Sequence, residues 1–202
     1  MLVHHLKVFA LLLSLQTIGV FSTFTNLPDV PPGVFNVSTR IETRSTKHAA
    51  WEALTDFARY PEWNPFVRAS IMVSSDNKTL PDQYPKEGRR LFLRTQIPPL
   101  PLPVNEDTPD VEVNTQYSYE NVTHVQWKLG RLAWASNDSS IQAERWSAIS
   151  NLGHGRVLYE SREVFHGALV ESLKNQLGKA LQAGFDAQGQ ALKLLLEDCD
   201  KD

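Results

Sequence analysis

The sequence contains little of what cross-linked or metal-dependent sites require. Its single cysteine among 202 residues, Cys199, excludes an intramolecular disulfide framework and any multi-cysteine metal site. The motifs G-x-S-x-G, H-E-x-x-H, G-x-G-x-x-G and the Walker loop, which mark common hydrolase, zinc and nucleotide sites, are also missing. The histidines of the globular part are scattered along the chain, so we expect neither a metal site nor a cofactor.

The chain also lacks a large excess of either positive or negative charge. The chain has 20 Lys+Arg against 23 Asp+Glu and a formal net charge of −3, with no basic block. This balance argues against nucleic acid or an anionic membrane as a partner. With 42% hydrophobic residues, the composition is that of one ordinary globular domain stabilised by a packed core.

The N-terminus carries the main apolar run, which extends from Val8 to Val20 behind a short segment containing Lys7. About 13 apolar residues are too few to span a bilayer, and Val20-Phe21-Ser22 resembles a cleavage site. We therefore predict a secretory signal peptide over residues 1–22, a secreted or lumenal protein, and no stable membrane anchor after cleavage. The alternative is a buried N-terminal helix.

Four N-x-S/T sequons support export and are candidate glycosylation sites: Asn36, Asn77, Asn121 and Asn137. The last three fall in predicted turns. The lone Cys199 is expected in a frayed helix end, within a tail over 198–202.

Hydrophobic periodicity predicts the order of the elements. After a proline-containing extended lead-in over 23–34, period-two alternation predicts a strand from Phe35. An apolar stripe predicts a helix that begins at Ser45 or Thr46 and ends at Pro61, with a short helix after it. Alternating runs then predict six strands, over 68–75, 89–97, 111–120, 123–134, 141–150 and 156–165. A leucine-rich stripe predicts a long helix over about 168–197.

That order predicts an α+β domain over 35–197, with an antiparallel sheet and helices on one face. Three glycines interrupt the stripe of the long helix: Gly178, Gly184 and Gly189. Each costs about 1 kcal/mol relative to alanine. They indicate either close packing against a neighbour or space left for something else.

Two segments resemble the START-like, SRPBCC superfamily, in particular its polyketide cyclase/dehydrase and coenzyme Q-binding START branch. One is the stretch from Ala49 to Phe66, AAWEALTDFARYPEWNPF; the other is Arg162 to Gly167 followed by the long helix with Gly184-Phe185 and Ala191-Leu192-Lys193. The resemblance spans about residues 35–196. It implies a helix-grip fold, in which seven antiparallel strands wrap round a long C-terminal helix and two short helices follow strand 1. It also implies a cavity for a lipid, polyketide or terpenoid, in a superfamily that includes carriers and cyclases.

Strand alternation then selects candidate catalytic residues. If Phe165 points inward, Glu163, Ser161 and Tyr159 do so as well. If Ile149 points inward, Ser147 and Arg145 point inward as well. In an apolar pocket, Glu163 could act as general acid or base, Arg145 could hold a carbonyl or enolate oxygen, and Tyr159 could donate a hydrogen bond. The alternative is a solvated or salt-bridged pair near the sheet edge, because a one-residue shift in register reverses every side chain.

Ligand-binding candidates are the aromatic and small polar residues assigned to the cavity wall: Trp63, Phe66, Tyr117, Tyr119, Trp127, Ser147, Ser161 and Phe185. Trp63 and Phe66 have two interpretations. They could gate the mouth of the cavity, or they could fill the core where the short helices meet the sheet.

Two functions remain open at this point. The first is a cofactor-free cyclase or isomerase, with pericyclases included, that acts on a hydrophobic polyketide- or terpenoid-like intermediate of secondary metabolism by holding a reactive conformation. The second is a non-catalytic secreted or lumenal carrier of a hydrophobic small molecule or lipid. Both predict a hydrophobic small-molecule partner and no nucleic acid. The oligomeric state is not predicted.

Overall fold

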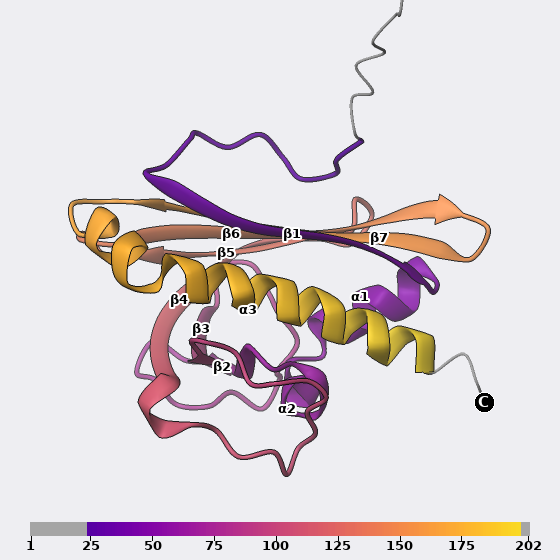
Figure 1. Cartoon of the computed structure of the whole chain (residues 1–202), viewed down its shortest axis with the longest axis horizontal. Helices are drawn as coiled ribbons and strands as arrows, with labels where there is room; N and C mark the ends of the chain where they lie inside the picture. The colour runs from indigo at the N-terminus through magenta and orange to yellow at the C-terminus, as the bar shows by residue number, and fades with distance from the viewer. Residues whose placement is uncertain (1–23, 199–202) are drawn as a thin grey trace, which may run out of the picture.

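The computed structural model describes residues 24–198, and the predicted leader and Cys199 lie outside the described residues. The fold is α+β, as predicted (Figure 1). Seven antiparallel strands form one sheet in the order β1-β7-β6-β5-β4-β3-β2. Their bounds are β1 Phe35–Arg44, β2 Val67–Val73, β3 Arg90–Gln96, β4 Thr115–Gln126, β5 Arg131–Asn137, β6 Gln142–Gly153 and β7 Arg156–His166.

The long helix α3, Val170–Asp198, lies across one face of the sheet, and the β2–β3 end of the sheet curls towards it (Figure 1). Two short helices, α1 Lys47–Thr55 and α2 Tyr60–Trp63, follow β1 and are joined by the single turn η1 Phe57–Arg59. This is the helix-grip arrangement. None of the helices within residues 24–198 is long and apolar enough to cross a membrane.

Local chemistry explains where the short helices begin and end. The Thr46 side chain caps α1 by accepting a hydrogen bond from the Ala49 backbone N–H at 3.1 Å. The sequence predicted that this helix ends at Pro61. In the structure α1 ends at Thr55, and Pro61 lies in the first turn of α2. A proline is tolerated there because the first turn of a helix leaves its N–H groups without intrahelical partners.

The predicted boundary between the fourth and fifth strands is wrong. Asn121 does not lie in a turn: β4 continues through it, with Asn121 opposite Arg90 on one side and Ala135 on the other. The turn comes instead at residues 127–130, where Gly130 has a φ of +72°, a conformation that favours glycine. Asn137 likewise ends β5, whereas Asn36 and Asn77 are exposed, on β1 and in the turn after β2.

Two of the three helix glycines have a packing reason. A Cβ at Gly184 would lie 2.6 Å from the Phe66 ring, and a Cβ at Gly189 would lie 2.9 Å from the Thr39 hydroxyl on β1. Side chains at these positions would push the helix off the sheet. Gly178 has only ordinary van der Waals surroundings.

The residues before β1 cover the sheet face opposite α3 (Figure 1). The Asn26 backbone N–H donates to the buried Glu160 carboxylate at 2.9 Å, and Arg40 donates to the same carboxylate at 2.6 Å. Arg40 also donates to the Phe24 carbonyl. The proline-containing segment is therefore part of the packed domain and satisfies a buried charge on the outer face of the sheet.

Candidate functional site

The alternation argument placed the candidates on β6 and β7 correctly. Arg145 lies directly opposite Glu163 in the register of these strands, and Ser147 lies opposite Ser161. Arg145 is 3% exposed and Glu163 is 9% exposed, while Tyr159 and both serines are fully or almost fully buried. The alternative of a solvated pair at the sheet edge is therefore wrong.

The Arg145 guanidinium is held by neutral partners. Its Nη2 donates to the Gln188 side-chain oxygen at 2.9 Å, and its Nε donates to the Ser161 hydroxyl at 3.3 Å. Aromatic rings surround it, with the Phe185, Trp134 and Phe66 centroids at 4.2, 5.3 and 5.6 Å. Among the described residues it forms no ion pair. A cation buried in this way relies on the rings and on carboxylates at longer range.

Gln188 is a site residue that the sequence analysis missed. It lies on the buried face of α3, and besides accepting from Arg145 it donates to the Tyr159 hydroxyl at 3.4 Å. Gln188 thus joins two of the three catalytic candidates. The available signal was its place in the helical repeat, three residues after Phe185 and four before Leu192, where an amide on an apolar stripe indicates a buried polar contact.

Glu120 on β4 is the second missed residue. It is 7% exposed, and it accepts one hydrogen bond, from the Ser118 hydroxyl at 3.2 Å. Burial, reinforced by the neighbouring Glu163, raises the pKa of Glu120 to about 8. Burial also raises the pKa of Glu163, and Arg145 opposes that rise. Two carboxyl groups and one guanidinium therefore share the inner face of the sheet.

We call the group of Arg145, Glu163, Glu120, Gln188 and Tyr159 the polar cluster. Tyr60 lies next to it, near enough for electrostatic interaction with Arg145 and Tyr159. Its hydroxyl donates to the Leu54 carbonyl at 2.7 Å, and burial raises the pKa of Tyr60. Tyr60 is therefore an uncharged residue that borders the polar cluster.

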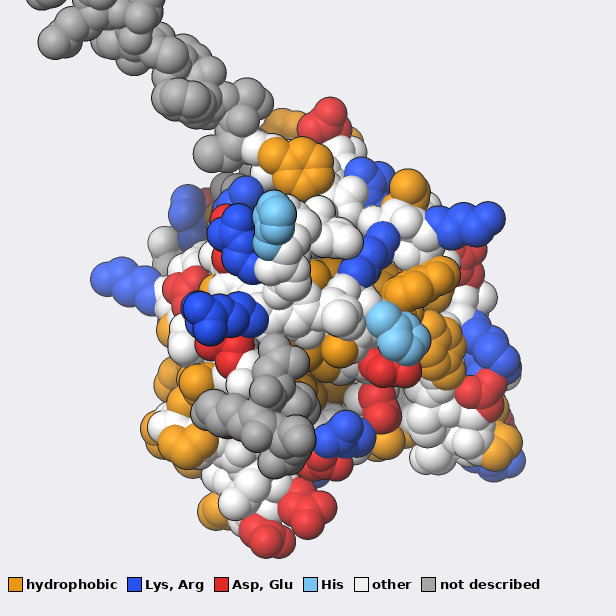
Figure 2. Space-filling model, turned by 90° about the vertical axis from the view of Figure 1, so that its right-hand side faces the viewer, with side chains coloured by type: hydrophobic (Ala, Val, Ile, Leu, Met, Phe, Trp, Pro, Cys, Tyr) orange, Lys and Arg blue, Asp and Glu red, His pale blue; other side chains and the backbone are white. Residues whose placement is uncertain are grey.

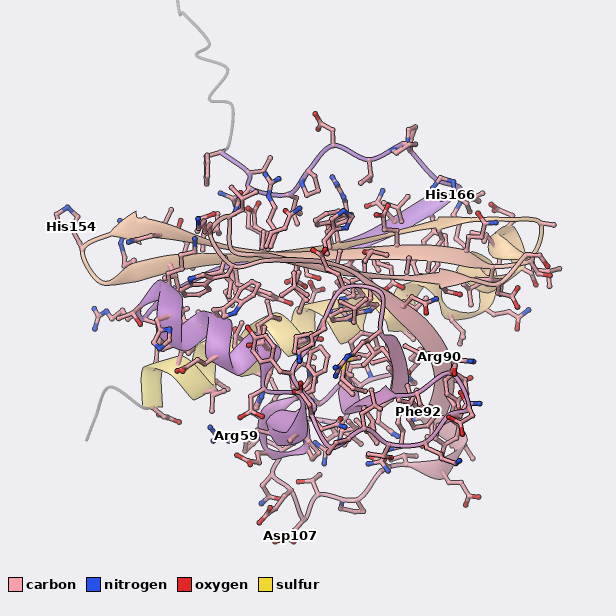
Figure 3. All side chains as sticks on the ribbon, turned by 180° about the vertical axis from the view of Figure 1, so that it is seen from behind. Arg59, Arg90, Phe92, Asp107, His154 and His166 are labelled. Atoms are coloured by element: carbon pink, nitrogen blue, oxygen red, sulfur yellow. The ribbon has the colours of Figure 1, made fainter. Side chains whose placement is uncertain are left out.

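Three ligand-binding candidates lie elsewhere, which corrects the prediction. Tyr117 and Tyr119 point to the outer face of the sheet, where both rings pack against Phe92; Tyr117 is 66% exposed. Figure 3 shows Phe92 and its neighbour Arg90 on that outer side of β3. The cause is the register of β4, in which Ser118, Glu120 and Val122 point inward instead.

Trp127 is not on a strand wall either. It lies in the β4–β5 turn, 44% exposed, with its ring 5.5 Å from the Trp51 ring of α1. It therefore packs on the outside of the short-helix end of the molecule.

Phe66 and Phe185 fill the core behind the cluster. Their ring centroids are 5.7 Å apart, and both face Arg145. Trp63 is also buried, but it borders a pocket. Of the two interpretations, core filling describes Phe66, while Trp63 lies at the boundary between core and pocket.

A pocket of about 600 Å³ opens at the end of the molecule where α1, α2 and the C-terminal part of α3 meet. Its apolar lining consists of Ala49, Ala53, Trp63, Leu195 and Leu196, and its polar lining includes Glu52, Asp56, Gln83 and Tyr84. Figure 2 shows this end, with hydrophobic side chains inside the hollow and charged side chains at its rim. The centroid of the Trp63 ring, which lines the pocket, lies 5.2 Å from that of the Tyr60 ring, which borders the polar cluster.

In the part of the chain that the structure describes, no group of three or more His, Cys, Asp or Glu side chains is placed to hold a metal ion. The polar cluster itself offers several chemical groups. They are two carboxyl groups with raised pKa values, a buried guanidinium, and the hydroxyl groups of two buried tyrosines.

Comparisons with known proteins address the fold. No protein-family model matches the sequence, and no curated protein is significantly similar to it. Solved structures are similar. A START superfamily protein from Mycobacterium smegmatis is 15% identical with a TM-score of 0.50, and the match covers 81% of this chain and 98% of that one.

Two further structures extend the comparison. Ginseng major latex-like protein 151 from Panax ginseng has a TM-score of 0.58 at 8% identity, over 80% of this chain and 97% of that one. The di-domain ARO/CYC BexL from the BE-7585A biosynthetic pathway has a TM-score of 0.50 at 5% identity, over 77% of this chain and 46% of that one. The chain thus has the START-like, SRPBCC fold that its sequence motifs indicated.

Proposed function

We propose that this protein binds a hydrophobic small molecule in the pocket between α1, α2 and α3. The observation that carries the proposal is the pocket itself, a concave space of about 600 Å³ lined by apolar side chains together with a few charged and polar ones. Pockets of this size and lining are typical of small-molecule sites. The START superfamily protein and the latex-like protein share the fold that forms it.

Filling the pocket tests this proposal. Ala53 is a half-buried residue of the pocket lining, and Ala53→Trp places a large ring where the ligand would lie. We expect at least a tenfold loss of affinity for an environment-sensitive apolar dye, measured by fluorescence titration. Ala183→Trp, on the exposed side of α3, is the matched control. Equal dye binding by both variants and the wild type would show that the pocket is not the site.

A second candidate function is turnover, as a cofactor-free cyclase or isomerase of a polyketide- or terpenoid-like molecule. The specific observation in its favour is the polar cluster, where a carboxyl group with a raised pKa lies beside a buried guanidinium. A carboxyl group with a raised pKa can give or take a proton at a higher pH than an exposed carboxyl group can. The cation can stabilise a developing enolate.

Turnover is tested by comparing the wild type with Glu163→Gln on a panel of linear polyketide and terpenoid precursors, followed by mass spectrometry. If Glu163 moves a proton in the reaction, we expect the variant to lose about 100-fold or more in kcat while it retains dye binding. Dye binding with no conversion of any precursor by either protein would leave a carrier as the function.

A further inference from the structure

Two helices end at the pocket, and both bring negative charge to it (Figure 1). Thr55, the last residue of α1, lines the pocket, and so do Leu195 and Leu196 in the last turn of α3. The C-terminus of a helix carries a partial negative charge, because its last carbonyl groups have no intrahelical partner. Basic residues often offset this charge. Within residues 24–198, neither α1 nor α3 has a basic residue in its last turn, and Lys193, one turn earlier, pairs with Glu197 at 3.7 Å.

Two carboxylates add to this negative charge. Glu52 and Asp56 both line the pocket, and they lie four residues apart on one side of α1 at its C-terminal end. Like charges at this spacing destabilise a helix, and carboxylates are unfavourable near a helix C-terminus. The Asp56 side chain makes no capping hydrogen bond to η1. Folding therefore does not account for this pair of carboxylates, whereas a cation in the pocket does.

The hydrogen-bond donors of the lining are, in contrast, largely engaged within the protein. The Gln83 amide donates to two backbone carbonyls, and the Thr55 hydroxyl donates to a third at 2.8 Å. Arg59, the one Lys or Arg among the described residues that line the pocket, pairs with Glu62 at 2.8 Å. An anionic ligand would therefore meet few available donors and two carboxylates that repel it.

The apolar part of the lining suits the skeleton of an organic cation. Trp63 and Tyr84 contribute aromatic side chains, and Ala49 and Ala53 contribute aliphatic ones. The Tyr84 side chain is held in place, because its hydroxyl accepts a hydrogen bond from the Trp51 indole N–H at 3.0 Å. Aromatic rings attract cations as well as apolar groups. The pocket thus combines apolar contact with negative charge.

We propose that the ligand of this pocket is an amphiphilic cation, an apolar skeleton that carries an ammonium group. The skeleton packs against the apolar lining, and the ammonium group lies beside Glu52 and Asp56 at the C-terminal end of α1. The inference rests on the proposed function, because it names the class of small molecule that the same pocket binds.

Three probes that share a naphthalene skeleton test the charge preference of the wild-type protein: 2-naphthylmethylammonium, 2-naphthylmethanol and 2-naphthoate. Their dissociation constants at pH 7 are measured by fluorescence titration or calorimetry. We expect the ammonium probe to bind about tenfold more tightly than the neutral alcohol, and the carboxylate probe to bind more weakly than both. Raising NaCl from about 20 to about 500 mM should reduce the tenfold preference to about threefold or less, because salt screens exposed charges.

Charge-removing variants then locate the ammonium group. The double variant Glu52→Gln, Asp56→Asn replaces two exposed side chains by amides of equal size, and it should bind the ammonium and alcohol probes equally. Glu171→Gln, Asp186→Asn removes the same charge from exposed positions of α3 outside the pocket and should keep the preference. Ala53→Trp should weaken binding of all three probes. A preference that survives in the first double variant, or ammonium binding that is undiminished in Ala53→Trp, would place the cation elsewhere and overturn the inference.

The outcomes separate this inference from the proposed function. If none of the three probes binds to the wild type, the proposed function fails and the inference fails with it. If the ammonium and alcohol probes bind equally to the wild type, the inference is overturned while the proposed function stands. Tighter binding of 2-naphthoate would assign the pocket to an anionic ligand and would also overturn the inference.

Discussion

Raising the pH from 5 to 8 should lower the free energy of unfolding of this protein by on the order of 3 kcal/mol, and Glu120→Gln should remove most of that loss. The Glu120 carboxyl has a pKa raised from 4.5 to about 8 by burial and by Glu163. Between these two values the folded protein holds a proton that the unfolded chain releases. Stability from this group is therefore complete below pH 4.5 and is lost as the pH rises through 8.

Urea titrations at four pH values between 5 and 8 measure this effect. Glu112→Gln, on the exposed turn η2, is the control and should follow the wild-type slope. Asp76, Asp82 and Asp138 have lowered pKa values from local hydrogen bonds, so their contributions are lost only in acid, outside this range. A flat wild-type profile would contradict the raised pKa of Glu120, and an equal slope in Glu120→Gln would assign the retained proton to Glu163, whose pKa burial also raises.

Arg145→Met should be the most damaging single change in the polar cluster. It removes the only guanidinium of the cluster and leaves Glu120 and Glu163 buried without a compensating cation. It also removes the donor for Gln188 and Ser161. Breaking a buried group of charges by deleting one member costs about 3–5 kcal/mol. We expect a loss of that size at pH 8, where the carboxyl groups are most ionised, and a smaller loss at pH 5.

The double variant Arg145→Met, Glu163→Met separates lost charge balance from lost packing. If charge imbalance dominates, the double variant should be more stable than Arg145→Met alone, because no unbalanced carboxylate from Glu163 remains. Arg156→Met is the control, since Arg156 pairs with Glu42 at 3.4 Å on the surface, where such pairs contribute about 0–1 kcal/mol. Equal costs for Arg145→Met and Arg156→Met would contradict the account of the cluster.

The alternation of hydrophobic residues correctly predicted which side chains face inward where a strand keeps one register from end to end. On β6 and β7, two inward hydrophobic residues, Ile149 and Phe165, were enough to place Arg145 and Glu163 on the inner face. On β4 the boundary was wrong because Glu120-Asn121 has the local composition of a turn, and the facing was wrong because the tyrosines were predicted to point inward. Pairing with β3 overrides that preference, and Glu120 becomes an inward residue while Tyr117 and Tyr119 turn outward.

Alternation, capping and the leucine stripe are local properties of the chain, so they were enough to predict most of the elements, their order and an antiparallel sheet with helices on one face; the helix-grip fold was predicted only from the resemblance of two segments to the START-like superfamily. The composition of the site, in contrast, depends on contacts between distant parts of the chain. Glu120, Arg145 and Gln188 come from β4, β6 and α3, and no sequence spacing relates them. Their meeting depends on the curl of the sheet around α3, which Gly184 and Gly189 allow by letting the helix backbone approach Phe66 and Thr39. The buried Glu120 Oε2, which has no hydrogen-bond donor, also follows from that packing, because the neighbours that the fold supplies decide which polar atoms find partners.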